Sequence, residues 1–380
     1  MRWPGDPIST DVLAGVLGQS AGRSLPIDEY WQRLRPHLRA LGISRVADIT
    51  GLDHIGFPVV QAVRPNARSN AVTQGKASTI TGAGIGAVLE CLEMAAGEDL
   101  HRLPTVPAQD APLWRSFAPG LPHGTEWPVA DTQYTRCREV VSDTGAALPR
   151  DLISTDFRHD APAASAPILR HSIGLGAGPS LAAALRHGLL ECIEADARIR
   201  LEHGGRSHRL SLSLDHPDYG AVLRQITSAG LRALVEDMPC QGGVVAVKAS
   251  VMEAPGATTL PLPATGYGAR ETCGAAIHAA LAEALQARLA VISGAREDIT
   301  QRFYVHGFSQ EELAAEWARH DQTPFAKASV DPVPVTLRQI AEAVAPVYAV
   351  PLFWDAGLPL AIIRVVAPKL IADPLRLSIP

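Results

Sequence analysis

A short pattern with two glutamates occurs twice in the sequence, each time inside an apolar stretch that predicts a helix. It reads Leu-Glu-Cys-Leu-Glu at residues 89–93 and Leu-Glu-Cys-Ile-Glu at residues 190–194. Carboxylates three residues apart lie on the same face of a helix, about one turn apart. An unpaired charge in an apolar environment is strongly disfavoured, so a fold that contains this pattern twice has to offset its negative charges.

A third Ala-rich helix is expected over residues 275–290, and it contains Glu283, Gln286 and Arg288. Glycine-containing segments precede all three helices, at residues 73–82, 173–180 and 264–274. The repeat period of about 100 residues is too long for a solenoid. The pattern therefore predicts a repeated α/β unit whose helices face a common centre.

The remaining chain shows the usual signals of strands, helices and turns. Residues 27–41 have apolar residues at helical spacing, with Pro36 as a kink, and residues 311–317 and 337–345 also predict helices. Strands are expected between residues 42 and 66, over 243–253 and over 360–366. Residues 107–149 are rich in proline and lack periodicity, so we expect an irregular segment that covers the core.

The glutamate pairs indicate a site for hard cations. Glu283 adds a fifth carboxylate to Glu90, Glu93, Glu191 and Glu194, and Mg²⁺ prefers oxygen ligands that it often shares with substrate phosphates. Lys76, next to Gly75, is a suitable phosphate partner, so the pattern predicts binding of a Mg²⁺–nucleotide.

Two other interpretations of the glutamate pairs exist. A single Glu-x-x-Glu on such a helix is usually a solvated face, but repetition with the same Leu and Cys neighbours argues against this for the pair. A di-iron bundle requires Glu-x-x-His on two helices, and no histidine follows either pair at that spacing.

Composition excludes several classes of protein. A chain of 380 residues with 47% hydrophobic residues can fold into one large domain or two ordinary ones. The net charge of -5 and the lack of a basic stripe argue against a nucleic-acid partner. The apolar stretch at 347–368 is broken by Pro351, Asp355, Pro359 and Arg364, so it predicts buried strands and no membrane partner. Without an apolar signal segment, and with five scattered cysteines, the chain is expected to be soluble and cytoplasmic.

Three ordered blocks of the sequence resemble the YcaO-domain family of ATP-dependent enzymes that activate peptide backbone amides. The first runs from residue 51 to Gln-Gly-Lys at 74–76 and on to the glutamate pair at 89–93. The second comprises residues 171–178 and 187–194, and the third residues 282–289 and 292–298. The resemblance covers roughly residues 42–370.

The resemblance implies an α/β fold with a single YcaO-type catalytic domain over residues 51–380 and an N-terminal helical extension over residues 1–50. Its internal pseudo-repeats would form a mixed sheet, with helices converging on a central nucleotide and Mg²⁺ site. It further implies ATP and Mg²⁺ as cofactors, a precursor peptide or protein as substrate, and a homodimer.

Residues 43–76 are similar to the subgroup that operates with a TfuA-like partner protein, which implies thioamide formation on ribosomal peptides or proteins. Azoline-forming cyclodehydratases of the family use a Cys, Ser or Thr of the precursor peptide and commonly end in a PxPxP-like tail. The present chain ends without such a tail, which favours thioamidation. The alternative outside the enzymes is a nucleotide-impaired subunit of a modification complex that only binds peptide.

The resemblance also assigns roles to individual residues. The five glutamates would bind the Mg²⁺ ions that bridge the nucleotide phosphates. Lys76 and Arg288 are candidate catalytic residues that contact phosphate, and the candidate nucleotide contacts are Lys76, His187, Glu191, Gln286 and Arg288.

Five positions that normally contact the nucleotide depart from the family pattern. A glycine is replaced by Ala77, a serine by Gly86, an asparagine by Pro179, and two arginines by Ala195 and Ala279. The lost arginines matter because a guanidinium fork binds phosphate in a geometry that other residues do not reproduce. Either other residues bind the nucleotide, His187 or Arg198 among them, or ATP use is changed or lost.

Overall fold

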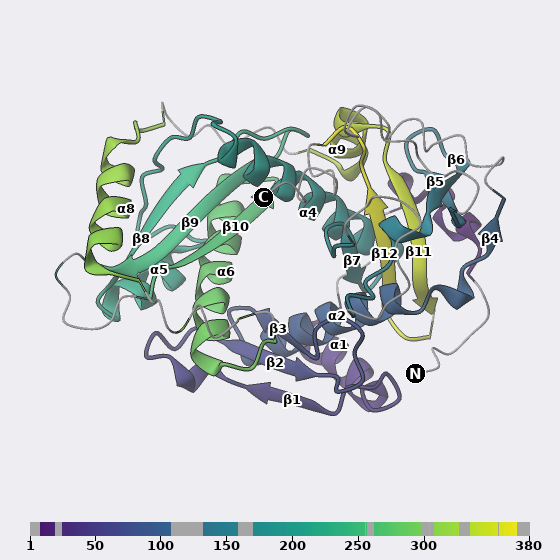
Figure 1. Ribbon diagram of the computed structural model, residues 1–380, viewed down its shortest axis with the longest axis horizontal. Coiled ribbons are helices and arrows are strands. Elements are labelled where there is room, and N and C mark those ends of the chain that lie inside the picture. The colour runs from purple at the N-terminus through teal and green to yellow at the C-terminus, as the bar shows by residue number, and fades with distance from the viewer. Residues whose placement is uncertain are drawn as a thin grey trace.

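Three units, each made of a strand and the helix that follows it, are the central feature of the computed structural model (Figure 1). The structure describes residues 8–19, 25–107, 132–158, 170–254, 256, 262–297, 299, 304, 308–326, 335–355 and 357–370. The units are β3 (Val72–Lys76) with α2 (Ile80–Glu98), β7 (Leu175–Gly178) with α4 (Leu181–Glu202), and β10 (Ala264–Arg270) with α6 (Cys273–Ser293). The predicted repetition of an α/β unit is confirmed, and it extends to the third helix.

The three helices begin in the same way. In each one a hydroxyl side chain at the N-cap accepts a hydrogen bond from the backbone N–H three residues later. These N-cap residues are Thr79, Ser180 and Thr272.

A glycine in each strand fixes how closely its helix packs. A Cβ atom at these glycines would lie 2.1 to 2.3 Å from a helix carbonyl oxygen, so any side chain would force strand and helix apart. The glycine–carbonyl pairs are Gly75 with Ala83, Gly176 with Ala184, and Gly266 with Ala280. The shared contact defines equivalent positions on the three helices. Glu90, Glu191 and Ala287 each follow the contacted alanine by the same number of residues, and by the same measure His187 of α4 is equivalent to Glu283 of α6.

The strands of the described residues form three separate antiparallel sheets, which corrects the expectation of one mixed sheet. The first has the order β1 (Arg45–Asp48), β2 (Val59–Val63), β3, and another the order β10, β9 (Val245–Glu253), β8 (Leu231–Asp237). The largest runs β4 (Thr105–Val106), β5 (Tyr134–Glu139), β11 (Tyr348–Asp355), β12 (Leu360–Val366), β7, with β6 (Thr144–Pro149) paired to β5. Each sheet therefore contributes one of the edge strands β3, β7 and β10 to a repeated unit.

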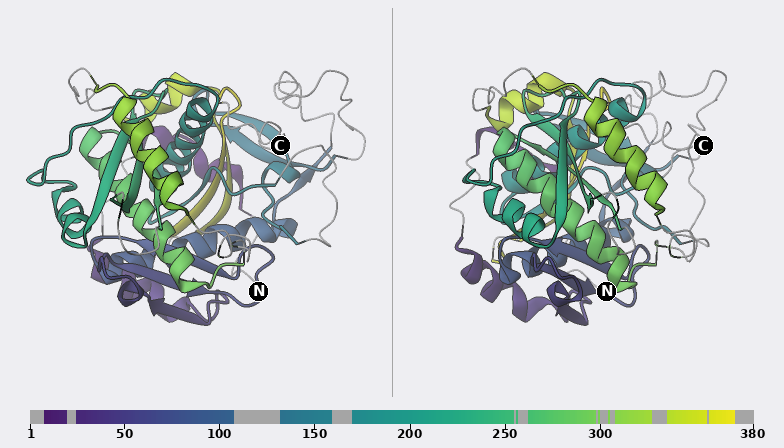
Figure 2. Two further views of the ribbon diagram at one scale, coloured as in Figure 1. Left: turned by 60° about the vertical axis from the view of Figure 1, so that its left-hand side comes forward. Right: turned by 90° about the vertical axis from the view of Figure 1, so that its left-hand side faces the viewer.

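Helices cover the sheets on both sides. Apolar residues of α2 pack against β2 and one face of the largest sheet, and those of α4 pack against its other face. α6 and α5 (Gly220–Ser228) cover one face of the β8–β10 sheet. α8 (Gln310–Gln322) lies on the opposite face through Leu313 and Trp317, as the turned views show (Figure 2).

Several predicted elements are confirmed, including the strands β9 and β12 and the helices α8 and α9 (Leu337–Val344). α1 (Ile27–Leu34) ends where a short 3-10 helix, η3 (Arg35–His37), contains the predicted kink at Pro36. The other 3-10 helices are η1 (Thr10–Leu13), η2 (Val16–Gly18), η4 (Thr50–Leu52), η5 (Leu100–Arg102) and η8 (Arg150–Leu152). β1 lies within residues 1–50, the range of the expected helical extension, but it pairs with β2, which lies after residue 51. The predicted domain boundary between residues 50 and 51 stays a prediction.

The expectation of an irregular segment over residues 107–149 is wrong for its C-terminal part. β5 and β6 form a hairpin there, with Asp143 in a left-handed conformation (φ 59°) at the turn. The alternation of buried and exposed residues along β5 is the signal that the proline content obscured. Residues 108–131 lie outside the described residues.

α2 and α6 are long and apolar enough, by composition, to cross a membrane. Of their most apolar stretches, 67% and 56% are buried inside the protein. Their apolar character is explained by packing, since α2 lies in the core cluster with β2 and β11 and α6 in the cluster with β8 and β9. The stretch at 347–368 forms β11 and β12, as expected.

Candidate functional site

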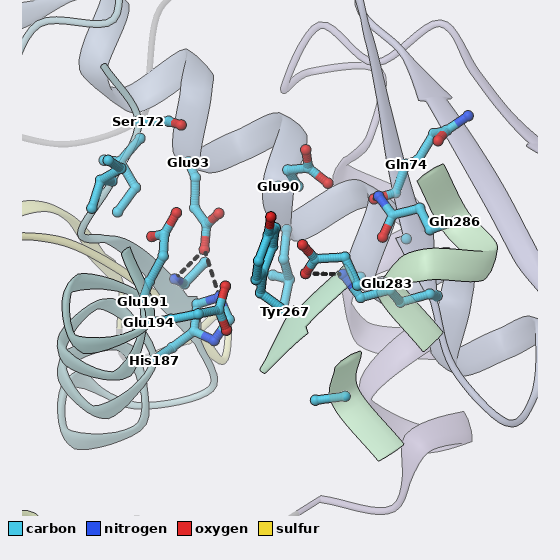
Figure 3. A pocket seen from close by; sticks show the side chains of 18 of the residues that line it. Gln74, Glu90, Glu93, Ser172, His187, Glu191, Glu194, Tyr267, Glu283 and Gln286 are labelled. Atoms are coloured by element: carbon cyan, nitrogen blue, oxygen red, sulfur yellow. Dashed lines mark hydrogen bonds and ion pairs between the residues drawn. The ribbon is translucent and has the colours of Figure 1, made fainter. Parts of the chain in front are cut away.

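A cavity of about 740 Å³ lies between the three repeated units; we call it the central cavity. All five predicted glutamates line it, and so do Lys76, His187 and Gln286 (Figure 3). Because α2, α4 and α6 each contribute at least one of these carboxylates, the predicted convergence on a common centre is what the structure shows.

Backbone N–H groups of the neighbouring unit position the carboxylates. Glu93 on α2 accepts a hydrogen bond from the Ala177 N–H of β7 at 2.5 Å, and Glu194 on α4 accepts one from the Ala269 N–H of β10 at 3.1 Å. On α6 the Gln286 amide donates to the Gln74 carbonyl of β3 at 2.9 Å. Each helix is thus tied to the next strand around the cavity, which closes the ring of three units.

Burial makes negative charge costly in this cavity. It raises the pKa of Glu191 to about 8, with a further contribution from Glu194, and it raises the pKa of Glu194 to about 7, with a contribution from Glu283. The pKa of Glu93 lies well above its usual range, because of burial and then the charge of Glu191. The pKa of Glu90 is also raised by burial, although Lys76 partly offsets the effect.

Few positive charges offset the carboxylates directly. The Lys76 ammonium forms an ion pair with Glu283 at 3.2 Å. His187 lies 3.9 Å from Glu93, but burial and then the charge of Arg270 lower its pKa to about 4, so the ring is neutral at pH 7. Divalent cations would supply the missing positive charge, and carboxylate oxygens are the ligands that Mg²⁺ prefers.

The carboxylates are distributed around the cavity walls. In the part of the chain that the structure describes, no three His, Cys, Asp or Glu side chains are grouped closely enough to bind one ion by themselves. This arrangement suits Mg²⁺, which usually takes one or two carboxylates and completes its coordination with water and phosphate oxygens. The donor set therefore fits a Mg²⁺–polyphosphate.

A second corner of the cavity contains buried polar atoms that lack partners. Both side-chain amide atoms of Gln74 and the Oε1 atom of Gln286 have no hydrogen-bond partner among the described residues, although only 1% and 9% of these two residues is exposed. A buried polar group without a partner is costly, so a ligand with polar edges would stabilise this corner.

The structure does not bring Arg288 to the central cavity. Its guanidinium is buried and donates to Asp53 at 2.9 Å and to Glu253 at 3.0 Å. Position 288 is five residues after Glu283, which places it on a different face of α6. These two ion pairs account for Arg288 as a structural residue, and its predicted phosphate contact receives no support from the cavity.

Three of the five departing positions line the cavity, Gly86 without a side chain and Ala195 and Ala279 with a methyl group each. Arg198 also lines it, as expected for a replacement contact. Sequence reasoning missed three further residues in the lining, Tyr267, Arg270 and Arg296. Tyr267 and Arg270 lie on β10, which has no repeated sequence pattern beyond its glycines, so only the strand-to-helix spacing could have indicated them.

A cavity that combines buried carboxylates with lysine and arginine side chains, between repeated α/β units, defines a protein that binds nucleotide through divalent cations. The family model described as "YcaO cyclodehydratase, ATP- and Mg²⁺-binding" matches residues 74–370. The chain belongs to the YcaO family.

Curated relatives extend over nearly the whole chain. An uncharacterised protein of Mycobacterium tuberculosis is 29% identical over 92% of this chain and 83% of its own length. An uncharacterised protein in the tfuA 3′ region of Rhizobium leguminosarum bv. trifolii is 26% identical over 96% of this chain and 93% of its own.

Solved structures agree with the fold. YcaO from Methanopyrus kandleri bound with AMPPCP and Mg²⁺ superposes with a TM-score of 0.69 at 21% identity, covering 92% of each chain. The E. coli microcin synthetase McbBCD complex contains a chain that matches with a TM-score of 0.63 at 12% identity, covering 85% of this chain and 87% of that one.

The family assignment confirms the predicted fold class, the enzymatic character and the predicted cofactors ATP and Mg²⁺. The protein is an ATP-dependent enzyme of a family that modifies peptide backbones. The roles of the individual site residues stay predictions; all of them except Arg288 line the central cavity.

Proposed function

We propose that this enzyme forms thioamides in ribosomal peptides or proteins, together with a TfuA-like partner protein in the cytoplasm. The relative in the tfuA 3′ region carries this proposal, because its 26% identity covers nearly all of both chains. The similarity of residues 43–76 to the TfuA-associated subgroup points the same way.

The chemistry follows from the weakness of an amide as an electrophile. The amide oxygen attacks the γ-phosphorus of ATP, and ADP leaves as the bond to the bridging oxygen breaks. A sulfur nucleophile then adds to the activated carbon, and phosphate leaves with the original oxygen. The thiol proton is released, and a C=S bond remains.

The residues of the central cavity suit the first step. Glu90, Glu93, Glu191, Glu194 and Glu283 would bind Mg²⁺, which neutralises phosphate charge when it is bound. Lys76 places a cation at the cavity wall beside Glu283, where it can contact a phosphate oxygen. Catalysis of phosphoryl transfer consists mostly of such positioning and charge stabilisation.

Mass spectrometry of a precursor peptide incubated with the enzyme, its TfuA-like partner, ATP, Mg²⁺ and a sulfide source tests the proposal. We expect a mass gain equal to the difference between sulfur and oxygen. The description of the family model, a cyclodehydratase, favours a second candidate function, azoline formation at Cys, Ser or Thr. That reaction would instead show the loss of one water and would refute thioamidation.

A third candidate, a nucleotide-impaired subunit that only presents peptide, rests on the short side chains at Gly86, Ala195 and Ala279 in the cavity lining. Titration calorimetry with ATP and Mg²⁺ distinguishes it, since this candidate predicts no binding to the protein or to its partner complex. Binding with Mg²⁺ dependence would exclude it.

A further inference from the structure

Two guanidinium groups in the central cavity are not engaged by its carboxylates. Arg198 on α4 and Arg270 on β10 both line the cavity, and among the described residues neither forms an ion pair with any of the five glutamates. Among the described residues Arg198 forms an ion pair with Glu202 on its own helix, at 3.8 Å, and its Nε atom has no hydrogen-bond partner there. The hydrogen bond recorded for Arg270 goes to the adjacent Ala269 carbonyl.

This arrangement is unusual for a cavity so rich in carboxylates. Arginine donors pair readily and bidentately with carboxylates or phosphates, and such pairs are among the stronger hydrogen bonds in proteins. In the same cavity Lys76 pairs with Glu283, whereas the two arginines leave donors available to a ligand. The two guanidinium groups therefore suit a ligand that is itself an anion.

Alanines beside the two arginines leave room for these side chains. Ala195 precedes Arg198 by three residues on α4, so both lie on one helix face, and both line the cavity. A Cβ atom at Gly268 would lie 3.0 Å from the Cβ atom of Ala279 on α6, so Ala279 faces this part of β10. Arg270 follows Gly268 by two residues and therefore lies on the same face of the strand. The short alanine side chains therefore border the space that each guanidinium reaches.

The neighbours of the two arginines locate them around the cavity. The guanidinium of Arg198 lies 5.6 Å from the centre of the Tyr267 ring, which also lines the cavity. Burial lowers the pKa of His187 and raises that of Glu194, and Arg270 lies close enough to both for its charge to lower the first further and to offset part of the rise in the second. Arg198 and Arg270 thus border the α4–β10 side of the cavity.

We propose that Arg198 and Arg270 bind the phosphate chain of the nucleotide, in place of the arginines that the resemblance expects at Ala195 and Ala279. This inference rests on the proposed function and names residues that would bind the nucleotide phosphates in this chain. Mg²⁺ bound by the glutamates and the two guanidinium forks would then share the neutralisation of the triphosphate charge.

Titration calorimetry with AMPPCP in excess Mg²⁺ tests the proposal on the full-length protein. We expect R198A and R270A each to weaken AMPPCP binding about tenfold or more, because charge-assisted hydrogen bonds are lost. Binding of adenosine should be unchanged in both variants. The relocated pairs R198A/A195R and R270A/A279R should recover most of the lost affinity, which a merely structural role would not permit.

The matched control is R186A, on the same helix as Arg198 but outside the cavity lining, where Arg186 pairs with Glu271. It should bind AMPPCP like the wild type. Wild-type affinity in R198A and R270A, or an equal loss for adenosine and AMPPCP, would overturn the inference while leaving the proposed function intact. No binding of AMPPCP to the wild-type protein would instead overturn the proposed use of ATP.

Discussion

The replacement of Glu191 by Gln should stabilise the metal-free protein at alkaline pH while removing its response to Mg²⁺–ATP. Glu191 has a pKa of about 8, raised mainly by burial and then by the charge of Glu194, whereas a glutamate in the unfolded chain has a pKa of 4.5. The unfolded state therefore releases its proton near pH 4.5 and the folded state near pH 8. Across this window unfolding releases a proton, so the stability of the folded protein falls as pH rises.

The magnitude follows from the difference between the two pKa values. A difference from 4.5 to about 8, at roughly 1.4 kcal/mol per unit, costs about 4 kcal/mol at pH 8 and below about 1 kcal/mol at pH 5. Glutamine has no such cost, and its carbonyl can still accept the 2.9 Å hydrogen bond from the Gly174 N–H. For a chain of 380 residues, about 4 kcal/mol corresponds to a rise in Tm of ~5 °C.

Thermal unfolding of wild type and E191Q at pH 5 and pH 8, each with and without Mg²⁺–ATP, measures this effect. We expect E191Q to melt higher than wild type at pH 8 without ligand, and at almost the same temperature at pH 5. Only wild type should gain stability from Mg²⁺–ATP. The exposed Glu311 gives the control variant E311Q, which should follow wild type throughout. A difference between E191Q and wild type that does not change with pH would refute the reasoning.

Other predictions concern packing and the ion pairs. G75A should lower the free energy of unfolding by about 3 kcal/mol or more, because the added Cβ atom would lie 2.1 Å from backbone atoms of α2. Urea unfolding measures this loss, and the control G51A, at a glycine with open space around it, should be near neutral. R288A should cost about 3–5 kcal/mol in the same assay, because Asp53 and Glu253 lose their buried partner, yet AMPPCP affinity should persist in the folded fraction. K76Q should weaken AMPPCP binding about tenfold in calorimetry, because the positive charge that Lys76 offers to a phosphate oxygen is lost.

The glutamate kernel made the centre of the fold predictable from sequence. Two carboxylates per helix inside apolar stretches left few arrangements other than convergence, and Glu90, Glu93, Glu191 and Glu194 do line one cavity. The third unit lacks the kernel, because the position equivalent to Glu191 is Ala287. Its place beside the other two was predicted from Glu283 and from the glycine-containing segment before the helix, and the shared glycine–helix contact confirms it.

Other parts of the site could not be read from spacing. Arg288 follows Gln286 by two residues in a block that resembles the family, but helical geometry turns it to Asp53 and Glu253 instead of the cavity. Arg270 reaches the cavity from the edge strand β10, whose Ala269 N–H donates to Glu194 of α4, and this tertiary contact has no signal in the residue spacing. The β5–β6 hairpin was hidden by the prolines around it.

The central claim is that Mg²⁺ and the nucleotide phosphates bind between the carboxylates of α2, α4 and α6. A crystal structure of the full-length protein with AMPPCP and Mn²⁺ in place of Mg²⁺ tests it most directly, because anomalous scattering locates Mn²⁺ without reference to the protein. The account predicts anomalous peaks within coordination distance of carboxylates from Glu90, Glu93, Glu191, Glu194 and Glu283. Peaks only outside the central cavity, with these glutamates free of metal, would contradict it.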